Sequence, residues 1–152
     1  AKVRGAFNEV SGTATIDGAN PSASSLEVTI QAASVDTRDA NRDGHLRSGD
    51  FFDAETYPTI TFKATGFAIT DDETVEVTGD LTIKGVTRPV TVPFTFGGAA
   101  VDPFGNSRIG FEGDVVVNRK DWDLTWNAAL ETGGVLVSDK VTLEFEVSAI
   151  KA

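Results

Sequence analysis

The chain contains no cysteine, no methionine and a single histidine among its 152 residues. Without cysteine it forms no disulfide and has no thiolate to act as a nucleophile or metal ligand. One histidine rules out zinc sites built from several imidazoles and leaves His45 as the one candidate imidazole base. The missing methionine predicts that the chain is processed, trimmed or incomplete at its start.

Positive charge is also scarce. The chain has 13 basic and 23 acidic residues, which gives a net charge of −10. Such a chain repels phosphate backbones, so we expect no nucleic-acid partner. No apolar run approaches the ~18 residues of a membrane-spanning helix, so we expect no integral membrane segment. A signal peptide is not visible, and the cellular compartment stays open.

What the sequence does contain is alternation of apolar and polar residues. A period of two places one row of side chains in the interior and the next toward water, as in half-buried antiparallel strands. The predicted strands cover 26–32, 75–83, 90–96, 109–117 and 141–147, with shorter candidates at 2–10 and 60–69 and further pairing at 13–17 and 134–137. Turns are predicted at 18–21, 71–72, 97–98 and 103–106. Many strands with little helix indicate an all-β barrel or sandwich.

The segment from Ser34 to Pro58 breaks this pattern and is too long for a hairpin loop. Asp39 is a suitable N-cap for a short helix that runs to about Ser48. Leu46 and the aromatic pair at 51–52 would then face the interior. We interpret the segment as one helical lid over the barrel.

Asp39 to Asp50 also fits the D-x-N-x-D-G pattern of a calcium loop, with carboxylates at positions 1, 5 and 12. Three features count against calcium: position 12 is the short Asp50, Arg42 and Arg47 lie inside the loop, and no amphipathic helix precedes Asp39. We therefore favour a helix cap with a surrounding Arg–Asp network and expect no metal.

The ten phenylalanines fall mostly in the inward rows. They could fill a small barrel, or they could line a roomier one that holds an apolar ligand. Trp122 and Trp126 are four residues apart, so in a strand they would share a face and either line a pocket mouth or cover a barrel end.

Catalysis finds little support in the sequence. His45 lies in the charged lid segment, where a structural hydrogen bond is the favoured role, and no carboxylate pair stands out. We expect no enzyme, no catalytic residues and no cofactor. An enzyme that acts on a small hydrophobic substrate inside the barrel and a structural module with a filled core remain the alternatives.

Several motifs occur together in a fixed order over nearly the whole chain. They are Val3-Arg-Gly-Ala-Phe7, Ser34-Val-Asp-Thr37, Arg42-Asp-Gly-His-Leu-Arg-Ser48, Asp50-Phe-Phe-Asp53, Tyr57-Pro-Thr-Ile-Thr-Phe62, Thr78-Gly-Asp-Leu-Thr-Ile-Lys-Gly-Val-Thr-Arg-Pro-Val90 and Asn118-Arg-Lys-Asp-Trp122. In this combination the chain resembles the YceI-like family of bacterial lipid-binding barrels.

The resemblance implies an antiparallel lipocalin-like β-barrel with an apolar tunnel for a polyisoprenoid lipid, such as an isoprenoid quinone or a prenyl diphosphate. It implies no catalytic residue and no calcium, and it allows a bacterial cytoplasmic or periplasmic location. Arginines could orient a phosphorylated head or instead pair with aspartates to hold the lid, and the second role is favoured. The arginines are 38, 42, 47 and 119, and the aspartates are 36, 43, 50 and 121.

We therefore expect a single domain over 1–152 that binds, carries or sequesters an isoprenoid-type lipid non-covalently. The ligand-binding side chains predicted from strand phase and family are Phe51, Phe52, Phe62, Phe94, Phe111, Trp122 and Trp126. The resemblance also predicts that the family's N-terminal strand is lacking. An open barrel edge of that kind would favour a homodimer.

Overall fold

The computed structural model describes residues 3–15, 19–129 and 136–150. Seven strands form one antiparallel sheet in the order β2-β3-β5-β6-β7-β8-β9, and two short strands, β1 and β4, pair separately. The bounds are β1 Ala6–Phe7, β2 Val10–Thr15, β3 Ser25–Gln31, β4 Val35–Asp36, β5 Thr59–Ile69, β6 Thr74–Ile83, β7 Val86–Val101, β8 Ser107–Asn118 and β9 Lys140–Ile150.

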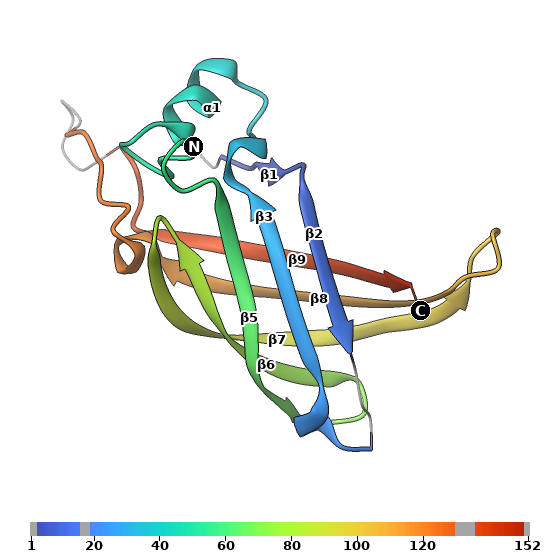
Figure 1. The fold of residues 1–152 in the computed structure, drawn as a ribbon. Helices are drawn as coiled ribbons and strands as arrows, with labels where there is room; N and C mark the ends of the chain where they lie inside the picture. Colours follow the sequence, from blue (N-terminus) through green and yellow to red (C-terminus); the bar gives the residue numbers. More distant parts are fainter. Residues whose placement is uncertain (1–2, 16–18, 130–135, 151–152) are drawn as a thin grey trace.

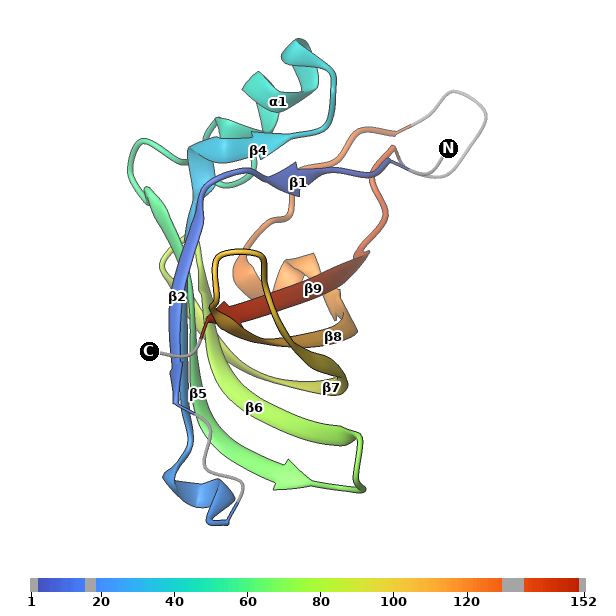
Figure 2. The same cartoon turned by 90° about the vertical axis from the view of Figure 1, so that its right-hand side faces the viewer.

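The large sheet curls into a half-barrel, with β2 and β9 at its two edges (Figures 1 and 2). The prediction of an all-β antiparallel barrel fold with one helix is confirmed. Of the individual strands, Ile60–Ile69 lies within β5 as predicted. The predicted strand at 2–10 is instead the short β1 followed by β2, which begins at Val10.

Two irregularities in strand pairing accompany the curl. The register shifts between Ala64 and Gly66 in β5, and again between Phe96 and Gly98 in β7. An extra residue in one strand bends the sheet and increases its twist. Gly98 has a φ of +121°, which favours glycine. The turn predicted at 97–98 is therefore wrong: these residues form a bulge inside β7, and the chain reverses later, at the turn predicted for 103–106.

The helix α1, Ala40–Arg47, is where the sequence places it. The Asp39 carboxylate accepts hydrogen bonds from the backbone N–H groups of Asn41 and Arg42, which satisfies donors at the helix start. The segment lies over one end of the curled sheet (Figures 1 and 2). We call this the α1 end. No helix among the described residues is long and apolar enough to cross a membrane.

The predicted Arg–Asp network around the helix is built differently. Buried Asp43 accepts hydrogen bonds from the backbone N–H and the hydroxyl of Thr37, at 2.8 and 2.5 Å. Arg42 donates to the Thr37 hydroxyl and carbonyl oxygens at 2.8 and 2.9 Å. Thr37 thus lies between the two charges, and Asp50 has His45 as its partner at 2.9 Å. Asp39, Asp43 and Asp50 thus each have a different hydrogen-bond partner, and no group of three or more carboxylates or imidazoles among the described residues is placed to hold a metal ion.

Aromatic rings cover glycines on the concave face of the sheet. A Cβ added to Gly79 would lie 2.5 Å from Cζ of Phe62, and a Cβ on Gly113 would lie 3.1 Å from Cδ1 of Phe94. Strand pairing places Phe94 directly opposite Gly113. The missing side chains therefore make room for rings from neighbouring strands, and the Phe145 ring joins Phe62 and Phe94 at centroid distances of 6.4 and 5.8 Å.

The segment after β8 is not a strand, contrary to the spacing argument for the two tryptophans. Arg119–Trp122 forms a 3-10 helix, η3, whose first turn is capped by the Asn118 side chain. The Trp122 indole N–H donates to the Leu81 carbonyl at 2.9 Å, so the ring covers the α1 end of the sheet. Trp126 follows in irregular chain.

Arg119 is a buried cation that holds this segment in place, with 6% of its surface exposed. Its guanidinium donates to four backbone carbonyls, those of Leu124, Trp126, Val137 and Ser138, at 2.6, 2.9, 3.3 and 2.8 Å. Arg119 was predicted to pair with one of the lid aspartates, but its acidic partner is Asp139, at 3.8 Å. Of the predicted pairing at 134–137, residues 134–135 lie outside the described residues. Leu136 is joined to Ala128 by a backbone hydrogen bond.

The turn between β7 and β8 depends on one aspartate. Asp102 accepts hydrogen bonds from the Arg108 side chain at 2.7 Å and from the backbone N–H groups of Asn106 and Phe104. The Arg108 guanidinium, followed by the Asn106 N–H, lowers the pKa of Asp102 from 3.8 to about 2.

This low pKa makes the hairpin acid-sensitive. Because the folded-state pKa lies below the unfolded value, the stabilisation is present above about pH 4 and is lost as the pH falls toward about 2. We expect Asp102→Asn to lower the thermal midpoint at pH 6 and to reduce its further fall between pH 4 and pH 2, followed by circular dichroism. Asp80→Asn removes one charge from an exposed site on β6 and serves as the control. An unchanged acid slope in Asp102→Asn would contradict the assignment.

Candidate ligand pocket

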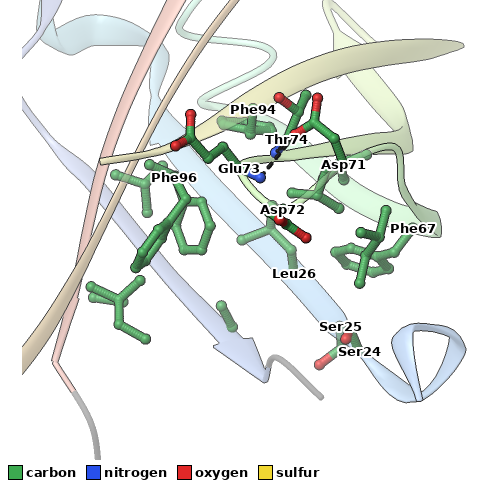
Figure 3. Close-up of a pocket in the computed structure, with 18 residues that line it drawn as sticks. Ser24, Ser25, Leu26, Phe67, Asp71, Asp72, Glu73, Thr74, Phe94 and Phe96 are labelled. Carbon is green, nitrogen blue, oxygen red and sulfur yellow. Dashed lines mark hydrogen bonds between the residues drawn. The ribbon is translucent and has the colours of Figure 1, made fainter. Parts of the chain in front are cut away.

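An apolar pocket of about 370 Å³ lies on the concave face, at the end of the sheet opposite α1. The pocket is lined by the end of β2, the start of β3, the end of β5, the start of β6 and the facing parts of β7, β8 and β9 (Figure 3). Its lining residues are Ala14, Ser24, Ser25, Leu26, Phe67, Ile69, Asp71, Asp72, Glu73, Thr74, Val75, Val77, Phe94, Phe96, Ile109, Phe111, Val147 and Ala149.

Strand register explains why these apolar side chains meet. Alternate residues of a strand point to the same face, so the pairs at 75/77, 94/96, 109/111 and 147/149 all face the interior. Across the sheet, Val75 pairs with Phe94, while Phe111 pairs with both Phe96 and Val147. The Phe96 and Phe111 rings lie 5.6 Å apart between centroids. The result is a continuous apolar surface built from four neighbouring strands.

Much of this surface is open to solvent. Phe96 is 40% exposed, Ile109 37% and Ile69 55%, although all three face the pocket. Contiguous exposed apolar surface inside a hollow is typical of a binding site rather than of a finished core. A volume of about 370 Å³ is within the usual range of small-molecule pockets, about 300–1,000 Å³.

The predicted ligand-binding residues fall into two groups. Phe94, which is 4% exposed and also belongs to the core, and half-buried Phe111 line the pocket. The other five predicted residues lie elsewhere on the concave face. Phe51, Phe62 and Trp122 are buried in the core at 7, 3 and 2% exposure, and Phe52 and Trp126 pack against that core. The α1 end of the concave face is therefore filled with side chains, whereas the opposite end is hollow.

Aromatic contacts define the filled end. His45 lies edge-on to Phe51 and Trp126 at centroid distances of 5.0 and 4.5 Å, and its Nε2 is 2.9 Å from a carboxylate oxygen of Asp50. Phe52 packs against Phe7 at 5.5 Å. The single histidine thus belongs to the packing of the lid segment and is not a pocket-lining residue.

Sequence reasoning did not name most of the pocket. Leu26, Val75, Phe96 and Val147 belong to the inward rows that alternation predicts, so their strand phase carried the signal. These four residues lie at the end of the concave face opposite α1. They meet in one hollow only because the sheet curls, and strand phase does not predict that curl. The turn predicted at 71–72, together with Glu73, also forms one side of the pocket.

A curled antiparallel sheet with a helix over one end and an apolar hollow at the other defines a barrel-type domain with an internal pocket. The YceI-like domain profile matches residues 1–149, and the chain belongs to the YceI-like domain family.

Among its relatives, the UPF0312 protein of Ectopseudomonas mendocina (strain ymp) is 45% identical over 121 residues, which cover 80% of this chain and 63% of that protein. Protein YceI of Escherichia coli O157:H7 is 44% identical over 120 residues, which cover 79% of this chain and 62% of that protein. The chain therefore spans less than two thirds of the length of these curated relatives.

Solved structures show the same fold. The Campylobacter jejuni YCEI protein is 33% identical, with a TM-score of 0.84 over all of this chain and 86% of that chain. Burkholderia cenocepacia BcnA is 31% identical, with a TM-score of 0.82 over 95% of this chain and 86% of that chain. A polyisoprenoid binding domain from Saccharophagus degradans, 20% identical, has a TM-score of 0.67 over 95% of this chain and 83% of that chain, and shows the fold alone.

Proposed function

We propose that the protein binds an isoprenoid-type lipid non-covalently in the pocket at the end opposite α1, as a carrier or store rather than as an enzyme. The observation that carries the proposal is the apolar surface of Ile69, Phe96 and Ile109, which are 55, 40 and 37% exposed and which the fold leaves open instead of filling. The family and the polyisoprenoid-binding domain among the structural neighbours support the same ligand class.

Burial energetics favour a long tail. Each buried CH₂ contributes about 0.8 kcal/mol, so fifteen buried carbons contribute roughly 12 kcal/mol before the costs of association. Those costs amount to at least about 4 kcal/mol. A net of roughly 8 kcal/mol corresponds to micromolar affinity. A short apolar molecule would therefore bind weakly, whereas an isoprenoid of fifteen carbons or more would bind with micromolar or higher affinity. Isoprenoid quinones and prenyl diphosphates both carry such tails.

Native mass spectrometry of the protein, purified from bacterial cells without detergent, tests the proposal. We expect an added mass that dissociates as an isoprenoid, or, if the protein is purified empty, saturable uptake of added geranylgeraniol. If the protein is purified without ligand and calorimetric titration detects no binding of geranylgeraniol, the proposal is overturned. The same spectra report whether two copies associate.

A further inference from the structure

The charged groups of the pocket lie on one turn. Asp71, Asp72 and Glu73 follow β5 and line the pocket beside Phe67 and Phe96 (Figure 3). We call these three residues the acidic turn. All three are exposed, so they border the opening rather than the interior. No lysine, arginine or histidine is among the described residues that line the pocket.

Hydrogen bonds fix the acidic turn in this position. The Asp71 carboxylate accepts from the backbone N–H groups of Glu73 and Thr74 at 2.8 and 2.9 Å. The Glu73 carbonyl accepts from the Phe96 N–H at 2.7 Å, which joins the turn to β7. The Glu73 N–H also lowers the pKa of the Asp71 carboxyl, which therefore stays ionised at neutral pH. The turn holds its negative charge beside the apolar surface as part of the fold.

Two described cations on the strands around the pocket are paired with carboxylates that do not line it. Lys63 of β5 lies 3.8 Å from Glu27, on the face of the sheet opposite Leu26. Arg108 of β8 is bound to Asp102 at 2.7 Å.

The convex face of β8 and β9 is itself acidic. Its register places Glu112 opposite Glu146 and Asp114 opposite Glu144. With a net charge of −10, the chain adds to the negative potential around the opening.

We propose that the acidic turn makes the pocket selective for lipids with an uncharged polar head, such as a quinone or an alcohol, and excludes the same tail with a diphosphate head. The inference rests on the proposed function and narrows its ligand class. A diphosphate head at the opening would meet three carboxylates and, in the part of the chain that the structure describes, no lining cation. Recognition of phosphate in proteins uses cations or clustered N–H donors. An uncharged head meets no such repulsion.

Two ligands with one tail separate the two proposals. Geranylgeraniol and geranylgeranyl diphosphate are titrated by calorimetry at ionic strengths of about 0.01 M and about 1 M, where the Debye length is roughly 30 and 3 Å. We expect the alcohol to bind at least about tenfold tighter than the diphosphate at low salt, and we expect salt to narrow that gap. Affinity for the alcohol should change little with salt.

A double variant tests the turn itself. Asp72→Asn with Glu73→Gln removes two charges and leaves Asp71 to hold the turn. We expect it to bind the diphosphate several-fold tighter than the wild type does, and so to reduce the ratio of the affinity for the alcohol to the affinity for the diphosphate. The matched control is Glu76→Gln with Asp80→Asn, which removes the same charge from exposed positions on β6 outside the pocket. Its affinity for the diphosphate should stay close to that of the wild type.

The failures are distinguishable. If neither ligand binds at either salt concentration, the proposed function is overturned. If both bind equally and the double variant changes neither affinity, the pocket binds lipid but the acidic turn does not select its head, and this inference alone is overturned. The inference alone is also overturned if the wild type binds the diphosphate more tightly than the alcohol.

Discussion

Replacement of Arg119 by alanine is expected to lower the free energy of unfolding by about 3–5 kcal/mol. The side chain is 6% exposed and donates to four backbone carbonyls. Its removal takes a donor from each of those carbonyls, of which, among the described contacts, Val137 alone keeps a bond from the Asn127 side chain, and opens a cavity where the guanidinium lay. For a domain of this size, a loss of that magnitude lowers the thermal midpoint by roughly 10 °C. Chemical denaturation followed by circular dichroism measures it.

Two further variants separate charge from geometry. Arg119→Lys keeps the positive charge but loses the planar fork of donors. We therefore expect its free energy of unfolding to lie between that of the wild type and that of Arg119→Ala. Lys120→Ala removes a half-exposed cation next in sequence, 3.3 Å from Asp139, and should cost about 0–1 kcal/mol. If Arg119→Ala were no less stable than Lys120→Ala, the four hydrogen bonds would not hold the segment in place.

Phe111→Asp is expected to weaken geranylgeraniol binding at least about 100-fold, which is about 2.7 kcal/mol. Phe111 lies in the middle of the apolar surface, paired with Phe96 on one side and Val147 on the other. The substitution removes a ring that would contact the lipid tail. It also introduces a carboxylate that the bound lipid tail would desolvate, and desolvation of a charged group is unfavourable.

The matched control for this variant is on the same strand. Val116 is 59% exposed and lies outside the pocket, so Val116→Asp makes a similar change in chemistry where no lipid is expected. We expect it to bind geranylgeraniol as the wild type does. Circular dichroism establishes that both variants are folded, and Phe111→Ala supplies a milder loss. A folded Phe111→Asp protein with wild-type affinity would place the lipid elsewhere.

Local patterns in the sequence were enough for most of the strands, for the helix and for its cap. Alternation of residue types sets which face of a strand is apolar, and Asp39 satisfies the first N–H groups of α1 regardless of distant contacts. The division of the apolar face into a filled end and a hollow end is not local. It depends on the bulges at Ala64/Gly66 and Phe96/Gly98, and on the packing of η3 against β6.

The two tryptophans show the same limit. A spacing of four residues places both on one face of a strand, but Asn118 caps a 3-10 turn instead, and Asp123 ends it in a left-handed conformation with a φ of 61°. The hydrogen bonds of Arg119 then direct the chain back over the sheet. The Asn118 cap is local, but Arg119 also binds carbonyls 18 and 19 residues away, and Trp122 binds one 41 residues away. Alternation of apolar and polar residues reveals neither kind of interaction.

This placement of the tryptophans has an optical consequence. Both indoles lie at the α1 end, Trp122 bonded to Leu81 and Trp126 packed on His45 and Phe51, whereas every aromatic ring in the pocket is a phenylalanine. The intrinsic emission of the protein therefore reports the packing beneath η3 and not the contents of the hollow. A spectrum unchanged by added lipid carries no information on occupancy. A probe that reads occupancy has to be placed among the pocket residues, and Phe96, which is 40% exposed and faces the hollow, is the position suited to it.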